Sequence, residues 1–274
     1  AVAALPVLWE FASSGLETSM ALAWMAGSWW LLVVAVDEGR LRRSAVVLMG
    51  VGWLIRPELL LMSAAFLIAL GAVDQRRRGW GSAARLLGVA AVVPLVAELL
   101  RAAYYGLLVP NTGLAKDAGG SWWSQGFRYL GDLSSPYLLW LPGLLALVVL
   151  SLLVVSRAKA QDRSGMLLVL VPVVAGLLDA LYVIDIGGDY MHGRLLLPAL
   201  FAIALPVVLA GSQLRSAAAV ASAGLVIWAV VAIVGLRTSP HPPKVIGLQT
   251  VFISDERQSW ISATGRAHPI TAAD

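Results

Sequence analysis

Long apolar runs separated by short polar segments dominate the chain. Six of these runs approach the roughly 20 residues that an α-helix needs to cross a bilayer, and they lie near residues 18–36, 82–103, 138–156, 165–183, 195–211 and 217–236. Several are slightly short, as tilted or packed membrane helices often are. The pattern therefore predicts an all-α, polytopic bundle of transmembrane helices.

The composition agrees with this pattern and excludes a soluble protein. Of the 274 residues, 59% are hydrophobic and only 13% are charged, against about 45–50% and about 25% in typical soluble domains. The chain contains no cysteine, which excludes disulfides, thiol catalysis and thiolate zinc. Its three histidines are too widely scattered for a histidine-cluster metal site. No bound cofactor and no metal-binding residue is predicted, and the sequence does not decide whether the reaction needs a metal ion.

Basic residues gather in a few of the polar segments. Eleven of the twenty lysines and arginines lie in segments 37–44, 74–85, 156–165 and 212–216. The positive-inside rule places these segments in the cytoplasm, and this explains the net charge of +4 better than a nucleic-acid partner does. The external side of the plasma membrane then receives segments 1–17, 104–136 and 184–194 and the tail from residue 237.

The apolar stretch 45–73 lies between two basic segments, so both of its ends are expected in the cytoplasm. Arg56-Pro57-Glu58 interrupts its middle, and proline removes a helical hydrogen bond while disfavouring a helical residue before it. Irregular backbone at membrane depth is tolerated only where it faces protein or a wet cavity. We therefore expect two re-entrant half-helices whose turn lies in a cavity.

Both ends of the sequence are typical of a piece of a longer protein. The chain starts within apolar sequence without the features of a signal peptide, and the composition changes sharply after residue 236. We expect a transmembrane domain over 1–236 whose first helices are missing. Residues 237–274 are then a linker and the truncated start of an external C-terminal domain.

Polar and charged residues collect at the predicted external ends of the helices. Ser14 and Glu17 have the spacing of a capping box, which we favour, although Glu17 can also line a site. Arg56 and Glu58 are ionisable groups in an apolar run, and such groups usually face a bundle interior or an aqueous pathway. A structural ion pair and a site role suit these two residues equally well.

A second polar cluster extends from Tyr104 to Lys116 and includes Tyr105 and Asn111. Tyrosines at a membrane boundary are commonly interface anchors. Lys116 is one of two basic residues in the external segment 104–136, the other being Arg128, and a lone lysine at headgroup level suits a phosphate ligand. The tryptophans at 122 and 123 are interpreted as an interface belt or a sugar-stacking platform.

The densest cluster is segment 185–194, which contains Asp189, His192, Arg194 and three glycines. An ordinary hairpin needs neither this charge density nor these glycines, so we assign the segment to a site. A carboxylate there suits sugar hydroxyls or proton transfer, and Arg194 suits a phosphate. The predicted donor- and substrate-binding residues are Glu17, Arg56, Glu58, Tyr105, Asn111, Lys116, Asp189, His192 and Arg194.

Four motifs carry a resemblance to a known family. SSGLET, RPELL, YYGLLVPNTGLAK and GGDYMHGRLLLP, in this order, resemble the polytopic GT-C glycosyltransferases that use polyprenyl-phosphate sugars. The final stretch, DERQSWISATGRAHPITAAD, is most similar to the actinobacterial terminal β-(1→2)-arabinofuranosyltransferases of arabinogalactan and lipoarabinomannan synthesis. The resemblance implies a GT-C fold that transfers arabinofuranose from decaprenylphosphoryl-arabinose to the ends of cell-wall arabinan.

The resemblance also implies a site on the external, periplasmic face and a catalytic aspartate in a loop that precedes Ala1. No residue of this chain is therefore named as the catalytic base. One alternative is another GT-C enzyme with a different sugar, such as a mannosyltransferase. Another is a transporter for lipid-linked sugars, which shares broken helices and midplane charges but should show a repeat that is not visible here. A purely structural subunit leaves GGDYMHGR unexplained.

Overall fold

The computed structural model describes residues 2–12, 14–39, 43–107, 120–211, 215–236, 253, 261 and 263–266. Every element longer than one residue in these ranges is helical. Five helices are long and apolar enough to cross a membrane: α2 (Thr18–Glu38), Pro57–Arg78, α6 (Trp80–Tyr105), α9 (Trp140–Lys159) and α10 (Arg163–Asp185). The predicted all-α, polytopic membrane fold is therefore confirmed.

The remaining helices are shorter. They are η1 (Val2–Ala4), α1 (Pro6–Ala12), α3 (Arg43–Gly50), α4 (Gly52–Ile55), α8 (Trp123–Ser134), α11 (Leu196–Ala204), η3 (Leu205–Gly211), α12 (Arg215–Val231) and η4 (Ala232–Leu236). The span Pro57–Arg78 consists of η2 (Pro57–Leu59) and α5 (Leu60–Arg78). The six runs predicted from hydropathy thus correspond to α2, α6, α9, α10, α11 with η3, and α12 with η4. Each observed helix or helix pair begins or ends within three residues of its predicted limits.

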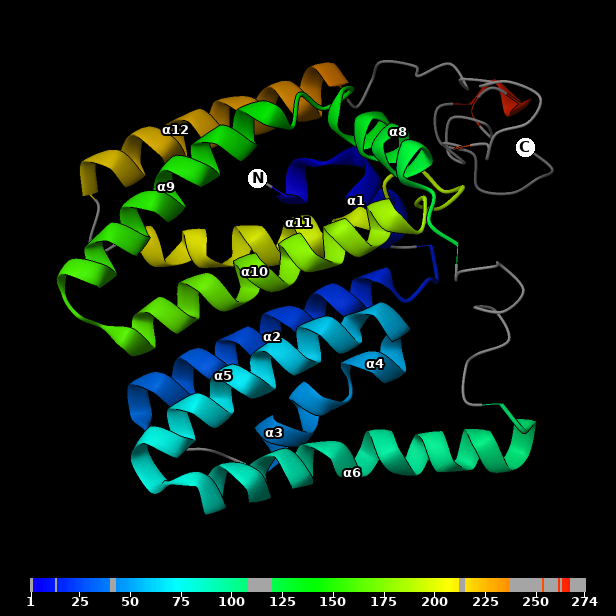
Figure 1. The fold of residues 1–274 in the computed structure, drawn as a ribbon. Coiled ribbons are helices and arrows are strands. Elements are labelled where there is room, and N and C mark those ends of the chain that lie inside the picture. Colours follow the sequence, from blue (N-terminus) through cyan, green and yellow to red (C-terminus); the bar gives the residue numbers. More distant parts are fainter. Residues whose placement is uncertain are drawn as a thin grey trace.

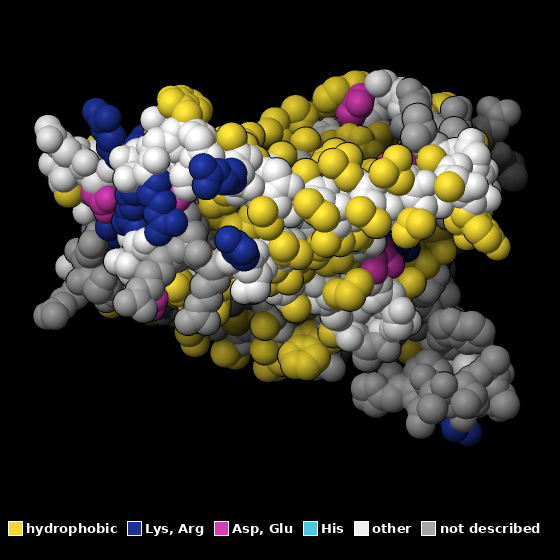
Figure 2. All heavy atoms as spheres, turned by 90° about the horizontal axis from the view of Figure 1, so that it is seen from below, with side chains coloured by type: hydrophobic (Ala, Val, Ile, Leu, Met, Phe, Trp, Pro, Cys, Tyr) yellow, Lys and Arg dark blue, Asp and Glu magenta, His cyan; other side chains and the backbone are white. Residues whose placement is uncertain are grey.

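The long helices lie side by side (Figure 1). α9, α10, α11 and α12 pack on one side of α2 and α5, and α3, α4 and α6 pack on the other. Lysines and arginines gather at one end of this bundle, while apolar side chains cover its middle (Figure 2). We call this the basic end, because α5 ends there with Arg76, Arg77 and Arg78 and α9 with Arg157 and Lys159. The opposite end is called the site end.

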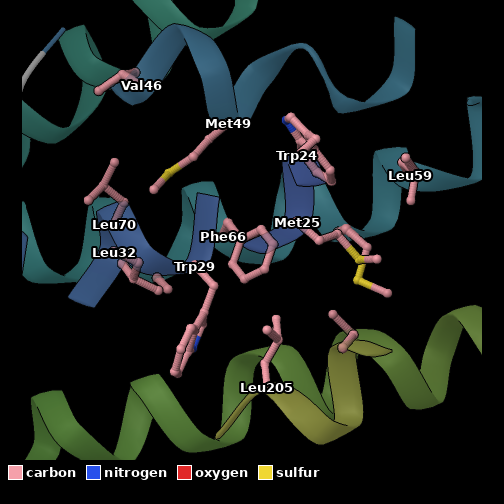
Figure 3. Packing of buried hydrophobic residues seen from close by; sticks show 14 of the residues in the cluster. Trp24, Met25, Trp29, Leu32, Val46, Met49, Leu59, Phe66, Leu70 and Leu205 are labelled. Carbon is pink, nitrogen blue, oxygen red and sulfur yellow. The ribbon is translucent and has the colours of Figure 1, made fainter. Parts of the chain in front are cut away.

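The largest buried apolar cluster lies between α2, α5 and their neighbours (Figure 3). Its fully buried members include Met25, Leu32 and Phe66, and burying an apolar side chain of this size stabilises a fold by about 1.5–3 kcal/mol in water. Two tryptophans in the cluster also satisfy their polar atoms: Trp24 Nε1 donates to Leu48 O at 2.6 Å, and Trp29 Nε1 to Leu168 O at 3.1 Å. These contacts fix α2 against α3 and α10.

The helix break at Arg56-Pro57-Glu58 forms a turn at the site end. Arg56 has an extended backbone, with φ −151° and ψ 137°, as expected for a residue before proline. The stretch begins near the end of α2, because α2 ends at Glu38 and α3 begins at Arg43. It also ends there, because Arg77 near the end of α5 donates to Ala35 O at 3.0 Å and Val36 O at 2.8 Å in the last turns of α2. The predicted return to the same end is therefore observed.

The length of the second limb differs from the prediction. Instead of a half-helix, Pro57–Arg78 contains 22 residues and is one of the five candidate spans. Only the first limb is short and broken, as α3 of 8 residues and α4 of 4 residues. The hairpin therefore extends along the whole of α2, and its turn reaches Glu17 at the start of that helix.

The predicted linker and the predicted start of a C-terminal domain lie mostly outside the described residues. Of residues 237–274, the structure describes only 253, 261 and 263–266. Ile253 is buried in an apolar cluster at the site end together with residues of α1 and α8. The division of the chain at residue 236 stays a prediction.

Candidate functional site

Three side chains from distant parts of the sequence meet at the site end. Glu17 Oε1 lies 3.0 Å from Arg194 Nη2 and 3.6 Å from Arg56 Nε. Glu17 precedes α2, Arg56 lies at the break between α4 and η2, and Arg194 lies just before α11. The sequence predicted these residues separately, and the fold brings them together.

Two further acids complete the network. Arg56 Nη2 also pairs with Glu58 Oε1, and Arg194 Nη1 lies 3.4 Å from Asp189 Oδ2. The Arg56 side chain is only 5% exposed and that of Arg194 is 14% exposed. Buried guanidinium groups keep their charge and need such partners. Glu17, Arg56, Glu58, Asp189 and Arg194 therefore form one network of ion pairs.

Glu17 does not form the capping box that its spacing from Ser14 suggested. Its side chain makes no capping hydrogen bond to α2, while Ser14 Oγ donates to Phe11 O at 3.3 Å. Partial burial alone would raise the pKa of the Glu17 carboxyl, but its own backbone amide and the guanidinium groups of Arg194 and Arg56 outweigh burial and lower it. Glu17 is therefore an ionised partner of the two arginines.

The 185–194 loop is held in shape by its glycines. Gly187, Gly188 and Gly193 have φ values of 86°, 78° and 66°, which favour glycine because other residues clash there. A Cβ atom at Gly188 would collide with the ring of Tyr129, and one at Gly193 would lie 2.6 Å from Leu133 Cδ1. These glycines therefore allow the loop to approach α8 closely.

Helix α8 supplies a group of polar contacts that the sequence did not reveal. Tyr129 OH donates to Met191 O at 2.8 Å and accepts from the Leu195 amide at 3.1 Å. Asp132 Oδ2 lies 2.5 Å from His192 Nδ1, and Tyr137 OH, in the turn after α8, lies 3.2 Å from His192 Nε2. α8 lies across the site end of α9 and α10 (Figure 1) and so fixes the loop that carries His192 and Arg194.

Not every predicted site residue joins this arrangement. Asn111 and Lys116 lie in 108–119, outside the described residues. The Tyr105 side chain is 65% exposed, and its ring packs edge-on against Tyr104 with centroids 4.7 Å apart. No hydrogen bond joins Tyr105 to the arginine network within the part of the chain that the structure describes.

Comparisons with known proteins give two related sequences. The chain is 32% identical to the terminal β-(1→2)-arabinofuranosyltransferase of Mycobacterium tuberculosis over 99% of its own length. It is 34% identical to the protein of the same name from Corynebacterium glutamicum over 72% of its length. The chain is related to the terminal β-(1→2)-arabinofuranosyltransferases. This confirms the resemblance that the sequence motifs indicated.

The chain spans about half of the Mycobacterium tuberculosis arabinofuranosyltransferase, 48%, and 32% of the Corynebacterium glutamicum arabinofuranosyltransferase. No family model matches the chain, and no solved structure matches it. The match to the Mycobacterium tuberculosis arabinofuranosyltransferase covers 99% of the chain, so the segments that carry the network lie within the matched region.

Proposed function

We propose that the chain is the membrane-embedded part of a GT-C glycosyltransferase. It transfers arabinofuranose from decaprenylphosphoryl-arabinose to the ends of the arabinan in arabinogalactan and lipoarabinomannan. The lipid donor enters as a substrate, and the proposal includes no bound metal or cofactor. The reaction takes place on the external, periplasmic face of the plasma membrane, which is the site end.

The observation that carries the proposal is the pair of buried arginines at the site end, in a chain related to arabinofuranosyltransferases. Polyprenyl-phosphate sugars carry their negative charge on a phosphodiester. Guanidinium groups offer planar pairs of donors to phosphate oxygens and stay charged when partly desolvated. Arg56 and Arg194 therefore provide a place for the phosphate of the donor.

The same arginines would assist the reaction itself. When an acceptor hydroxyl attacks the anomeric carbon, the bond between that carbon and the phosphate oxygen breaks, and the electron pair remains on the phosphate. Fixed positive groups stabilise the charge that develops there. The proton of the hydroxyl needs a base, and we assign that role to none of the described residues.

Replacing Arg194 tests the proposal. In the purified full-length protein, Arg194→Ala should weaken donor binding roughly ten- to a hundredfold, because a hydrogen bond to a charged group contributes roughly 1.5–3 kcal/mol. Arg194→Lys should recover only part of this loss, since lysine lacks the forked donor geometry. The measurements are donor affinity and arabinofuranosyl transfer to a synthetic arabinan acceptor.

Arg128→Ala is the matched control. Arg128 lies on the same end of the molecule, on the exposed face of α8, and it makes no ion pair with another described residue. Donor affinity should hardly change in this variant. Equal donor affinity in a folded Arg194→Ala protein would contradict the phosphate role, and transfer of mannose in place of arabinofuranose would contradict the proposed donor.

A further inference from the structure

A single carboxylate oxygen occupies the space between the two arginines. Glu17 Oε1 is 3.0 Å from Arg194 Nη2 and 3.6 Å from Arg56 Nε. Guanidinium groups bind carboxylate and phosphate oxygens with the same donor geometry. Glu17 therefore lies where one oxygen of an anionic ligand would contact both arginines.

Both arginines also keep a buried donor that is not used. Arg56 Nη1 and Arg194 Nε are buried, and neither has a hydrogen-bond partner among the described residues. An unpaired buried donor is unfavourable, more so when the group is charged. A ligand with several acceptor oxygens could reach these donors, whereas Glu17 Oε1 does not.

The charge of the network limits how such a ligand can bind. Two positive side chains, Arg56 and Arg194, face three negative ones, Glu17, Glu58 and Asp189, so the network carries a net charge of −1. The carboxyl of Asp179 on α10 is fully buried near Glu58 and Arg56. A carboxyl group cannot offset the negative charge of the network. A phosphodiester added to this group would raise the net charge to −2 in a poorly solvated place, where like charges repel strongly. Binding is far more favourable if one carboxylate leaves.

Glu17 is the carboxylate best placed to leave. Its side chain is 28% exposed, against 14% for Glu58 and 7% for Asp189. It follows the irregular segment 14–16, and it makes no capping hydrogen bond that would hold it on α2. Glu58 and Asp189 would remain to hold Arg56 and Arg194 in place.

We propose that Glu17 is an internal substitute for the phosphodiester of a lipid-linked ligand, which displaces it from between Arg56 and Arg194. Ligand binding is then an exchange of one monoanion for another, and the net charge of the network stays at −1. This inference rests on the proposed function, because it concerns the same phosphate position. It assigns Glu17 the role of a competitor, so that Glu17 limits affinity for anions instead of contributing to it.

The test is the sign of the change in affinity when Glu17 loses its charge. The full-length protein is placed in lipid nanodiscs and titrated with a soluble prenyl phosphodiester, farnesyl methyl phosphate, and separately with inorganic phosphate. Glu17→Gln should bind the phosphodiester at least about tenfold more tightly than the unchanged chain, because a charge at contact distance is removed. A larger gain for the prenyl phosphodiester than for inorganic phosphate would identify a lipid-linked ligand.

Asp185→Asn is the matched control. It removes one negative charge from the same end of the molecule, and the Asp185 carboxylate makes no ion pair with a described residue. The affinity of this variant for the phosphodiester should stay within about twofold of that of the unchanged protein, since Asp185 is partly exposed and pairs with neither arginine, so that solvent and salt screen its charge. Thermal unfolding of each variant serves as the folding control.

Three results would overturn the inference. If folded Glu17→Gln binds the phosphodiester more weakly, Glu17 orients Arg194 and does not compete with the ligand. If Asp185→Asn gains as much affinity as Glu17→Gln, the effect is one of overall charge. If no variant binds either anion, the phosphate position in the proposed function is wrong as well, whereas the first two results leave that position intact.

Discussion

At the scale of single residues, the Tyr129 hydroxyl connects α8 to the loop that carries Arg194. It makes two hydrogen bonds, to Met191 O and from the Leu195 amide. Burial raises the pKa of this phenol far above its usual value, because desolvation disfavours the phenolate. The hydroxyl therefore keeps its proton, and with it the donated bond, at any pH at which the protein is handled.

Tyr129→Phe should lower the free energy of unfolding by about 1–3 kcal/mol, because the Leu195 amide and the Met191 carbonyl lose their partner. A raised pKa in the folded state means that this contribution is complete below the ordinary tyrosine pKa of about 10 and is lost only at higher pH. The difference between the two proteins should therefore stay constant from about pH 5 to about pH 9.

Denaturant unfolding in detergent micelles measures this difference. Tyr190→Phe is the control, since Tyr190 is 44% exposed and the described residues offer its hydroxyl no hydrogen bond. Equal destabilisation by both substitutions would show that the Tyr129 hydroxyl does not hold the loop.

Residues of the site were predictable where their chemistry conflicted with their surroundings. Arg56 and Glu58 are charged residues in an apolar run, and Arg194 ends a segment rich in glycine and charged residues. Each therefore differs from what the surrounding sequence leads one to expect, and this difference marks it as a candidate. Asp132 and Tyr129 are not exceptions, because polar residues are ordinary on an amphipathic helix. Their role depends on which face of α8 meets the loop, and sequence spacing alone does not reveal the partner.

At the scale of elements, the turn between α9 and α10 shows how a polar loop starts a membrane helix. Asp162 Oδ1 accepts a hydrogen bond from the Gly165 amide at 2.8 Å, and Arg157 Nη1 donates to Asp162 Oδ2 at 2.6 Å. The bond from the Gly165 amide, with further help from Arg157, lowers the pKa of Asp162. Asp162 thus caps α10 and joins it to the end of α9.

Asp162→Ala should lower the free energy of unfolding by about 0.5–2 kcal/mol, the usual contribution of such a cap. A lowered pKa in the folded state means that the contribution is present above the ordinary aspartate pKa of about 3.9 and is lost as the pH falls through the folded value. The stability difference should therefore shrink in acid. Thermal unfolding at several pH values measures it, with Asp162→Asn as a variant that keeps an acceptor. A difference that does not change with pH would contradict an ionised cap.

The broken hairpin shows what sequence patterns can and cannot establish about an element. Proline and the charges beside it marked the turn at Arg56-Pro57-Glu58, and the basic segments marked both ends. The depth of the hairpin was not visible, because 45–73 has the length of one span and suggested two half-helices. In the structure α5 runs on through its basic residues to Arg78, so the second limb gains a turn beyond the apolar run.

At the scale of the whole molecule, the segregation of charge predicted most of the architecture. Basic segments recur along the chain between the apolar runs, and the fold gathers their lysines and arginines at one end of the bundle (Figure 2). The alternation of basic segments and external segments along the chain predicts the direction in which each helix runs. It does not predict which helices pack against each other. The packing of α10 against α5 and α11 depends on side-chain shapes that hydropathy does not describe.

The same segregation predicts the orientation of the bundle in the membrane, and this prediction is open to a direct test. These 274 residues contain no cysteine, so within them one introduced cysteine reports on one position. Ala160 lies exposed at the basic end and Ser124 lies exposed on α8 at the site end. Because the positive-inside rule places the basic end in the cytoplasm, a membrane-impermeant maleimide added to intact spheroplasts should label Ser124→Cys and leave Ala160→Cys unlabelled.

Permeabilised cells provide the control for this labelling, since both cysteines should then react to a similar extent. Labelling of Ala160→Cys alone in intact cells would reverse the orientation. It would also move the arginine network to the cytoplasmic face, where a lipid-linked sugar presented on the external leaflet does not reach it. The proposed function therefore requires that the site end and the acceptor polymer lie on the same side of the membrane.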